Sequence, residues 1–243
     1  MSLYRDEAIV LRTQKLGEAD RIITLLTREH GRIRGVAKGV RRTKSKFGAR
    51  LEPGSHVDIQ LYTGRTFDTV TQVESIFNYG EALTDDYSRW TIAGAILEAA
   101  ERFTSHEHEP ALQEFKLVTG AMKALAEDKY DPSMILDAYL LRSLAVGGYA
   151  PSLTNCSKCD ASGPHRYFSL VGGGLVCADC RPSASATPAP ETLKLMSDLI
   201  SGNWESAMAS ELRNRREANG LIAAYLQWHL ERGLRSLQLV ERA

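Results

Sequence analysis

The stretch that decides the N-terminal fold is His56-Val57-Asp58-Ile59-Gln60-Leu61-Tyr62. Its apolar residues alternate with polar ones, which is the pattern of a strand with one buried face. Thr63-Gly64-Arg65 follows as a turn, and the next run, Phe67-Asp68-Thr69-Val70-Thr71-Gln72-Val73, is rich in β-branched residues. We therefore expect the second run to return antiparallel to the first as a β-hairpin.

Three further strands are predicted upstream of this hairpin. They cover residues 8–13, 21–27 and 32–37, which are dominated by Ile, Val, Leu and Thr, and a turn at Glu29-His30-Gly31 separates the last two. Five short strands are too few for a stable two-sheet sandwich. We expect a small closed β-barrel of the OB-fold type, because a closed barrel leaves no exposed sheet edge.

Beyond residue 80 the apolar residues follow helical spacing. Helices are predicted at about 85–103, 110–127, 132–146, 191–200 and 212–237, and residues 181–190 form a proline-rich linker. The fold class is therefore α+β and multidomain: a barrel followed by an all-α domain with an inserted four-cysteine zinc ribbon. The expected domains are an OB-fold nucleic-acid-binding domain at 1–80, an α-helical domain at 81–150 and 186–243, and a zinc module at 151–185.

Composition and charge narrow the function classes. The 243 residues are 43% hydrophobic, which excludes disorder as the main state, and 30 basic residues balance 30 acidic ones. Residues 1–80 carry 14 Lys+Arg and 9 Asp+Glu, a net +5, which leaves a net −5 for the remainder. The longest apolar runs are shorter than the ~18 residues of a membrane span, and the opening stretch Met-Ser-Leu-Tyr-Arg-Asp-Glu contains charges where a signal peptide needs a hydrophobic block. We expect a soluble cytoplasmic protein with no membrane contact.

All four cysteines lie within 25 residues, as Cys156-Ser-Lys-Cys159 and Cys177-Ala-Asp-Cys180. The spacing C-x₂-C-x₁₇-C-x₂-C predicts one zinc ion held by four thiolates. Such a site has no open position for water, so we expect a structural ion that folds the segment. Two disulfides or unrelated free thiols are the alternatives, and the missing secretory signal disfavours disulfides. His165 fits the spacing worse than a cysteine, and we interpret it as a surface residue.

A strongly basic segment runs from Arg28 to Arg50, with nine basic residues against the single acid Glu29, a net +8. Such a field attracts phosphate groups. The predicted DNA-binding residues on the strand and the following loop, with one aromatic for base stacking, are Arg32, Arg34, Lys38, Arg41, Arg42, Lys44, Lys46 and Tyr62. Phe47 and Phe67 are further aromatic candidates, although Phe67 suits the core better. The alternative is a solvated charged face that binds nothing.

The sequence has no motif that assigns an enzyme. It lacks a P-loop, a nucleophile elbow and the deaminase zinc motif. His106-Glu-His-Glu109 precedes Pro110, and its histidines lack the i, i+4 spacing of a zinc protease. We interpret this stretch as an exposed loop. No catalytic residue is predicted.

The order of motifs along the chain resembles that of the RecO family of bacterial recombination mediators. The resemblance rests on Ala8-Ile-Val-Leu-Arg-Thr13, the strand and turn from Gly17 to Gly31, the Lys38-Gly-Val-Arg-Arg-Thr-Lys-Ser45 loop and Leu51-Glu-Pro-Gly54. It continues in Gly148-Tyr-Ala-Pro151, Leu226-Gln-Trp-His-Leu230 and Leu234-Arg-Ser-Leu237. The resemblance covers almost the whole chain.

The resemblance implies a non-enzymatic protein that binds single- and double-stranded DNA and anneals complementary strands. It also implies work with RecR to load RecA onto strands coated by single-strand-binding protein, in the cytoplasm at the nucleoid. A tail of single-strand-binding protein would dock on the helical domain, where a pocket at Arg142 is one option. The competing hypotheses are a zinc-ribbon RNA-binding or transcription-associated factor and a scaffold that binds only protein.

Overall fold

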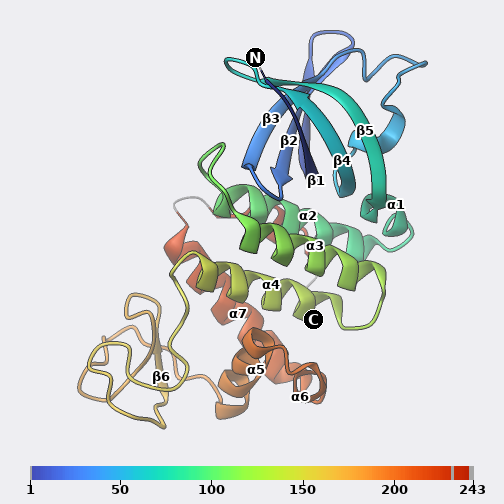
Figure 1. Cartoon of the computed structure of the whole chain (residues 1–243). Coiled ribbons are helices and arrows are strands. Elements are labelled where there is room, and N and C mark those ends of the chain that lie inside the picture. The colour runs from blue at the N-terminus through green and yellow to red at the C-terminus, as the bar shows by residue number, and fades with distance from the viewer. Residues whose placement is uncertain (1, 231–232, 241–243) are drawn as a thin grey trace. The chain divides into compact units, whose positions relative to one another are not determined.

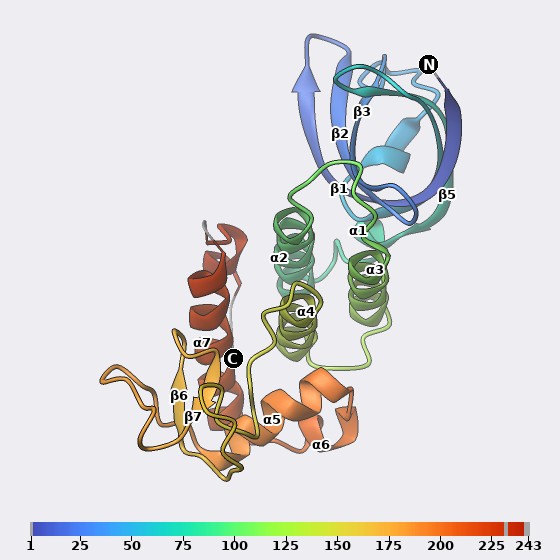
Figure 2. The same ribbon diagram turned by 60° about the vertical axis from the view of Figure 1, so that its left-hand side comes forward.

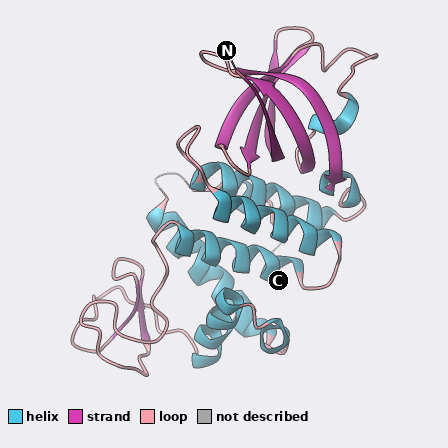
Figure 3. Cartoon of the chain, viewed as in Figure 1, coloured by secondary structure: helices cyan, strands magenta, loops and turns pink. Residues whose placement is uncertain are grey.

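The computed structural model of the protein describes residues 2–230 and 233–240. The chain divides into two compact units, one up to Glu127 and the other from Asp128 onward. Figure 3 shows that the strands belong to the N-terminal sheet and to one short hairpin, while the other elements are mainly helices. The α+β fold class is therefore confirmed.

The first unit is built on five strands. They are β1 (Leu3–Leu16), β2 (Asp20–Thr27), β3 (Gly31–Ala37), β4 (Ser55–Tyr62) and β5 (Asp68–Asn78). Their hydrogen-bonded order, β1-β2-β3-β5-β4, closes on itself because β4 also pairs with β1. Figure 2 shows this ring of strands. The five strand predictions and the antiparallel β4–β5 hairpin are confirmed.

Alternation places one face of every strand inside this barrel. Val57, Ile59 and Leu61 of β4 are fully buried there together with residues of the other strands. Among the described residues, the one parallel pairing between barrel strands joins β3 to β5, and its register consists of Gly35 opposite Asp68 and Val36 opposite Thr69. Because these buried apolar side chains fill the barrel interior, a ligand must bind on the outside of the barrel or at its rim.

Three helices complete the first unit: α1 (Tyr79–Ala82), α2 (Tyr87–Phe103) and α3 (Leu112–Ala126). Asp86 caps α2 by accepting a hydrogen bond from the backbone N–H of Arg89. Figure 1 shows α2 and α3 side by side next to the strands. Arg12 of β1 makes two hydrogen bonds to the Glu101 carboxylate, at 3.0 and 2.7 Å, which fixes α2 against the sheet.

The second unit contains α4 (Pro132–Val146), α5 (Pro190–Ser201), α6 (Trp204–Met208), α7 (Leu212–His229) and the short 3₁₀ turn η2 (Ser236–Gln238). Asp131 and Pro132 begin α4 as predicted. The predicted extension of the last helix to Leu237 is wrong, because Leu230 has an extended backbone and ends α7. The sequence reading missed α6, which at five residues is too short for a periodic pattern.

Residues 151–185, which we call the cysteine module, contain two short strands, β6 (Tyr167–Ser169) and β7 (Gly174–Val176). They pair antiparallel, as expected for a ribbon hairpin. Phe168 is buried and contacts the ring of Tyr225 on α7 edge to face, at 5.8 Å. The proline-rich segment is held as well, since Ala186 exchanges backbone hydrogen bonds of 2.8 and 2.9 Å with Phe168.

Candidate nucleic-acid interface and metal centre

The basic loop, residues 38–50, connects β3 to the rest of the barrel and presents its cations to solvent. The side chains of Lys38, Arg41, Arg42, Lys44, Lys46 and Arg50 are all exposed. The loop backbone is anchored at its start, where Gly39 N–H donates to Asp20 Oδ1 at 2.7 Å and Arg41 N–H donates to the Ala19 carbonyl at 2.9 Å. Five of the side chains predicted to bind DNA phosphates therefore lie together on one exposed loop.

Three cations of this loop donate to backbone carbonyls, and within the part of the chain that the structure describes no ion pair is found for them. Arg41 donates to the Glu18 carbonyl at 2.9 Å, Lys46 to the Thr71 carbonyl at 3.0 Å, and Arg50 to the Lys46 carbonyl at 3.1 Å. Carbonyl oxygens are neutral, so these contacts orient the cations without cancelling their field. An oxyanion gains more from a charged donor than a carbonyl does.

The interpretation of Phe47 as a stacking residue is wrong. Its side chain is only 2% exposed and belongs to the barrel core together with Leu51. The physical reason is the 3₁₀ turn η1 (Gly48–Leu51), which returns the chain to the barrel and takes its apolar residues inward. Lys46 lies over the outer side of this site, with its Nζ 4.9 Å from the centre of the Phe47 ring.

The two other aromatic candidates lie at the β4–β5 turn. Tyr62 is 46% exposed, so its ring is accessible to a base. Phe67 is half-buried, and the guanidinium carbon of Arg34 lies 4.9 Å from its ring centre. Phe67 is therefore covered by a cation at the surface and does not belong to the barrel core.

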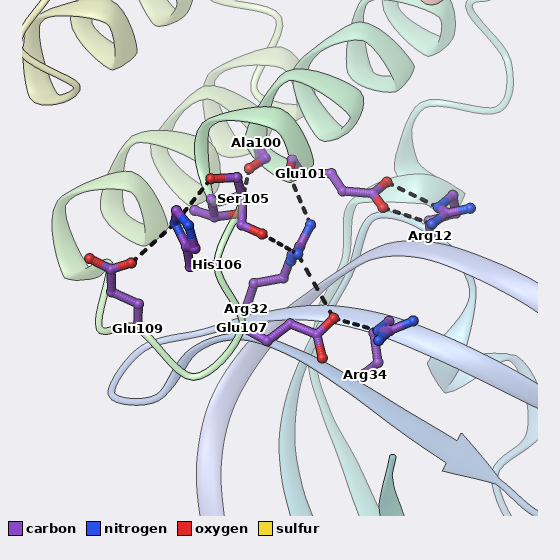
Figure 4. Close-up of polar contacts among 10 residues, drawn as sticks. Arg12, Arg32, Arg34, Ala100, Glu101, Ser105, His106, Glu107 and Glu109 are labelled. Atoms are coloured by element: carbon purple, nitrogen blue, oxygen red, sulfur yellow. Dashed lines mark hydrogen bonds and ion pairs between the residues drawn. The ribbon is translucent and has the colours of Figure 1, made fainter. Parts of the chain in front are cut away.

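The arginines of β3, Arg32 and Arg34, differ from the loop cations because the carboxylate of Glu107 lies next to both of them. Arg34 Nε lies 2.5 Å from Glu107 Oε1, and Arg32 Nη2 lies 3.8 Å from the same oxygen. Figure 4 shows both side chains pointing toward Glu107, which belongs to the connection between α2 and α3. The prediction that Arg32 and Arg34 share a face is confirmed. Sequence reasoning missed Glu107, since no local pattern links residues so far apart.

The stretch His106-Glu-His-Glu109 is only partly an exposed loop. His106 and Glu109 are 80% and 71% exposed, whereas Glu107 is 24% exposed. Among the described residues, the one group of side chains placed to hold a metal ion is the four cysteines.

In the cysteine module, Cys156, Cys159, Cys177 and Cys180 converge. Their Sγ atoms all lie within 4.8 Å of one another, and none forms a disulfide. The Sγ atoms of Cys159 and Cys177 are 3.8 Å apart. Sulfurs bound to one tetrahedral zinc at ~2.3 Å are separated by ~3.8 Å, so the arrangement fits that ion.

The pKa values of two of these cysteines are shifted in opposite directions. The backbone N–H of Cys177, followed by those of Cys159 and Lys158, lowers the pKa of Cys156 to about 6 against the opposing effect of burial. The neighbouring Cys177 and Cys159 thiols raise the pKa of Cys180 to about 12. Four thiols at these distances cannot all lose their protons unless a positive charge offsets the repulsion between the resulting thiolates.

Two arginines of the cysteine module lie against an aromatic ring, and its histidine contacts a backbone carbonyl. The guanidinium carbons of Arg166 and Arg181 lie 5.2 and 4.4 Å from the ring centre of Tyr167. His165 hydrogen bonds through Nε2 to the Ala161 carbonyl at 2.8 Å and is not one of the four converging ligands. The interpretation of His165 as a residue other than a ligand is consistent with this geometry.

Arg142, considered above for a docking pocket, has another role in the second unit. Its Nη2 and Nε donate to the Leu199 carbonyl at 2.8 and 3.1 Å, and its Nε also lies 3.2 Å from the Ile200 carbonyl. These carbonyls end α5, so the guanidinium caps that helix. Burial lowers the pKa of Arg142 from its usual value.

Within the described ranges, the helices lack the combined length and apolar composition needed to cross a bilayer. Two family models match the chain: Recombination protein O N terminal over residues 1–79 and Recombination protein O C terminal over residues 84–238. The boundary between them lies before α2, whereas the compact units divide after α3.

Curated relatives match over the full length of both chains. A protein of Thermobifida fusca named DNA repair protein RecO is 59% identical over 243 residues. The proteins of the same name in Streptomyces avermitilis and Frankia casuarinae are 58% and 54% identical, and each alignment covers 100% of both chains. Together with the two family models, these identities show that the chain belongs to the RecO family of DNA repair proteins.

Proposed function

We propose that the protein is a non-enzymatic recombination mediator that binds single- and double-stranded DNA and anneals complementary strands. Membership of the RecO family assigns it to recombinational DNA repair. The observation that carries the proposal further is the basic loop, whose exposed cations donate to neutral carbonyls. A surface of this kind neutralises phosphates without reading sequence.

The proposal assigns separate roles to parts of the chain. The closed barrel would be an OB fold that forms the DNA-binding domain with residues 1–80, and its contacts would be Arg32, Arg34, Lys38, Arg41, Arg42, Lys44, Lys46 and Tyr62. The helical domain would comprise 81–150 and 186–243. The inserted module at 151–185 would hold one structural Zn²⁺ on Cys156, Cys159, Cys177 and Cys180, which fill its coordination shell.

The physical basis of annealing is the repulsion between two polyanions. A basic loop that replaces condensed counterions on both strands lowers this repulsion and needs no chemical energy source. The exposed Tyr62 ring supplies a sequence-independent stacking surface next to the strands. ATP hydrolysis therefore has no place in the proposed reaction.

The proposed partners follow from the family's role in repair. The protein would act in the cytoplasm at the nucleoid, with RecR, on DNA covered by single-strand-binding protein, and would thereby help RecA to load. Annealing of complementary oligonucleotides, with and without single-strand-binding protein and without ATP, tests this proposal. Annealing of bare and coated strands is the expected result, and no annealing of either would overturn the proposal.

The role of the basic loop is tested by changing Arg41, Arg42, Lys44 and Lys46 together to Ala. If the wild-type protein contacts about five phosphates, the slope of log affinity against log salt is about −3.5 on single strands. The variant should bind more weakly with a slope near −0.7, because about four contacts are lost. A matched control changes the exposed Lys116, Lys123, Arg213 and Arg216 to Ala, which removes the same charge elsewhere.

An equal loss in the control variant would show that net charge governs binding and would contradict an interface at the basic loop. Comparison of DNA with RNA strands tests nucleic-acid preference. Stronger annealing of RNA would favour the RNA-binding alternative, and no retention of either on the protein at ~0.15 M salt would favour a protein scaffold.

A further inference from the structure

The connection between α2 and α3, residues 104–111, lies directly on the outer side of β3. The backbone N–H of His108 donates to the Arg32 carbonyl at 3.0 Å, and Arg32 forms a parallel bridge with Glu107. Gly31 has φ +69, and a Cβ built there would lie 1.7 Å from the Glu109 carbonyl oxygen. Only glycine fits this position, so the close approach of the α2–α3 connection is built into the barrel.

Two arginines of β3 meet this connection in different ways. Arg32 Nη2 donates to the Ser105 carbonyl at 2.5 Å and Nη1 to the Glu101 carbonyl at 3.4 Å, and its side chain is only 16% exposed. These contacts of Arg32 also hold the connection in place. The Arg34 side chain is 39% exposed and contacts Phe67 and the Glu107 carboxylate.

We propose that Glu107 is an internal competitor for DNA, whose carboxylate occupies the Arg34 guanidinium until a backbone phosphate displaces it. The inference rests on the proposed function. A carboxylate and a phosphate are both oxyanions that accept charge-assisted hydrogen bonds from the same guanidinium donors. Figure 4 shows Glu107 reaching across to Arg34 from the α2–α3 connection.

The place of Arg34 in the barrel makes this exchange relevant to a bound strand. Arg34 lies on β3, four residues before Lys38 at the start of the basic loop, which is about 13 Å along an extended chain. A nucleic-acid strand that follows the basic loop can therefore reach Arg34 without a second binding surface. The Arg34 Nε atom that faces Glu107 is buried, but the Arg34 side chain as a whole is 39% exposed, so solvent weakens the ion pair and reduces the free-energy cost of exchanging the carboxylate for a phosphate.

Because Glu107 occupies Arg34, the protein binds DNA more weakly, and its affinity for DNA depends less on salt. Each phosphate contact on a single strand adds about 0.7 to the magnitude of the log–log salt slope. A strand that must displace Glu107 gains less from Arg34 than from an exposed cation of the basic loop. The proposed effect of Glu107 is thus to limit tight binding to strands that engage the rest of the interface.

The test is Glu107→Gln, which removes the charge while keeping the side-chain size. We expect single-stranded DNA to bind about three- to fivefold more tightly at low salt, with a slope steeper by about 0.7. The matched control is Glu109→Gln, which removes the same charge from the same connection. Glu109 is 71% exposed and lies 3.5 Å from His106, so the slope should stay at the wild-type value.

Two further variants separate a specific pair from a general charge effect. In an Arg34→Ala background, Glu107→Gln should give no additional gain beyond that of Glu109→Gln. Glu107→Asp keeps the charge but shortens the side chain by one methylene, and it should bind DNA more tightly than the wild-type protein. This variant also provides the measurement if Glu107→Gln does not fold.

The proposal is overturned if Glu107→Gln gains no more than Glu109→Gln, if its gain persists without Arg34, or if Glu107→Asp binds like the wild-type protein. These outcomes are distinct from failure of the proposed function. If the wild-type protein binds single strands through the basic loop and Glu107 has no effect, only this inference fails. If the wild-type protein binds no DNA, the proposed function itself fails.

Discussion

The barrel and the cysteine module are both small, yet different interactions hold them together. The barrel encloses a continuous cluster of buried apolar side chains from all five strands. The cysteine module has two strands of three residues each, and its buried apolar side chains include Phe168, Leu175 and Val176. Where a segment is too short to bury a core, bonds to a metal ion can supply the missing stability.

The largest expected effect comes from Cys156→Ser, which separates the two kinds of stabilisation. Structural zinc binding contributes about 10–16 kcal/mol of apparent free energy in small zinc domains. We expect the variant to lose bound zinc and the module to lose amide protection, while the barrel keeps its own. Zinc content per chain and hydrogen exchange by mass spectrometry measure both. A control at the exposed Ser183, changed to Ala, should retain the metal.

Retention of one zinc per chain by Cys156→Ser would contradict the four-thiolate assignment. Loss of protection in the barrel as well would show that the comparison between the two regions is wrong.

The second prediction breaks the barrel instead. Phe47→Ala removes a fully buried ring from the apolar core, which costs about 3–5 kcal/mol in the free energy of unfolding. Zinc content should not change. Urea unfolding followed by circular dichroism measures the loss, and the exposed Lys44→Ala serves as a control with a change within about 0.5 kcal/mol. A Phe47→Ala variant as stable as the control would place Phe47 outside the core.

The third prediction tests whether apolar contacts stabilise the cysteine module independently of the thiols. Phe168 contacts Tyr225 and pairs through its backbone with Ala186, so it is an apolar anchor that is independent of the thiols. Phe168→Leu should destabilise the module by about 1–2 kcal/mol while the zinc remains bound. Hydrogen exchange at residues 168 and 186 and zinc content measure these effects. Simultaneous loss of the metal would show that the anchor and the thiols act as one unit.

The smallest expected effect is a pH dependence in the helices that carry the module. Burial lowers the pKa of His229, whose ring lies 4.5 Å from that of Tyr225 and 4.8 Å from that of Tyr149. The folded chain therefore binds a proton less readily than the unfolded chain. The stability contribution is complete above the unfolded pKa of about 6.5 and falls as the pH drops through the lowered folded pKa.

His229→Gln removes this titration, and comparison with the wild-type protein cancels the contributions of the other histidines. The melting temperature of the variant should fall less between pH 7.5 and 5.5 than that of the wild-type protein. An equal fall in both would show that His229 does not contribute.

Sequence patterns predicted the parts of the molecule whose residues are close together in the chain. The alternation of Val57, Ile59 and Leu61 identified β4, Asp131-Pro132 identified the start of α4, and the cysteine spacing identified the four converging thiols. In each case the physical constraint acts within one strand, one helix turn or one short loop. Such constraints leave a periodic or spaced pattern that can be recognised without the structure.

The remaining features depend on contacts that the chain makes over long distances. The Glu107 carboxylate meets Arg34 because the α2–α3 connection lies on β3, and neither residue belongs to a pattern that includes the other. Phe47 stands among basic residues, yet η1 directs it into the barrel. A local reading assigns both residues to solvent, and tertiary packing decides otherwise.

The short parallel β3–β5 pairing affects where the barrel opens locally. Gly35 opposite Asp68 and Val36 opposite Thr69 form the shortest register among the barrel pairings, and the other four pairings are antiparallel and longer. Local opening begins where the fewest ladder bonds must part. The barrel should therefore open first at the β3–β5 pairing, next to Arg34. Amide protons there should exchange with deuterium before those of the neighbouring ladders.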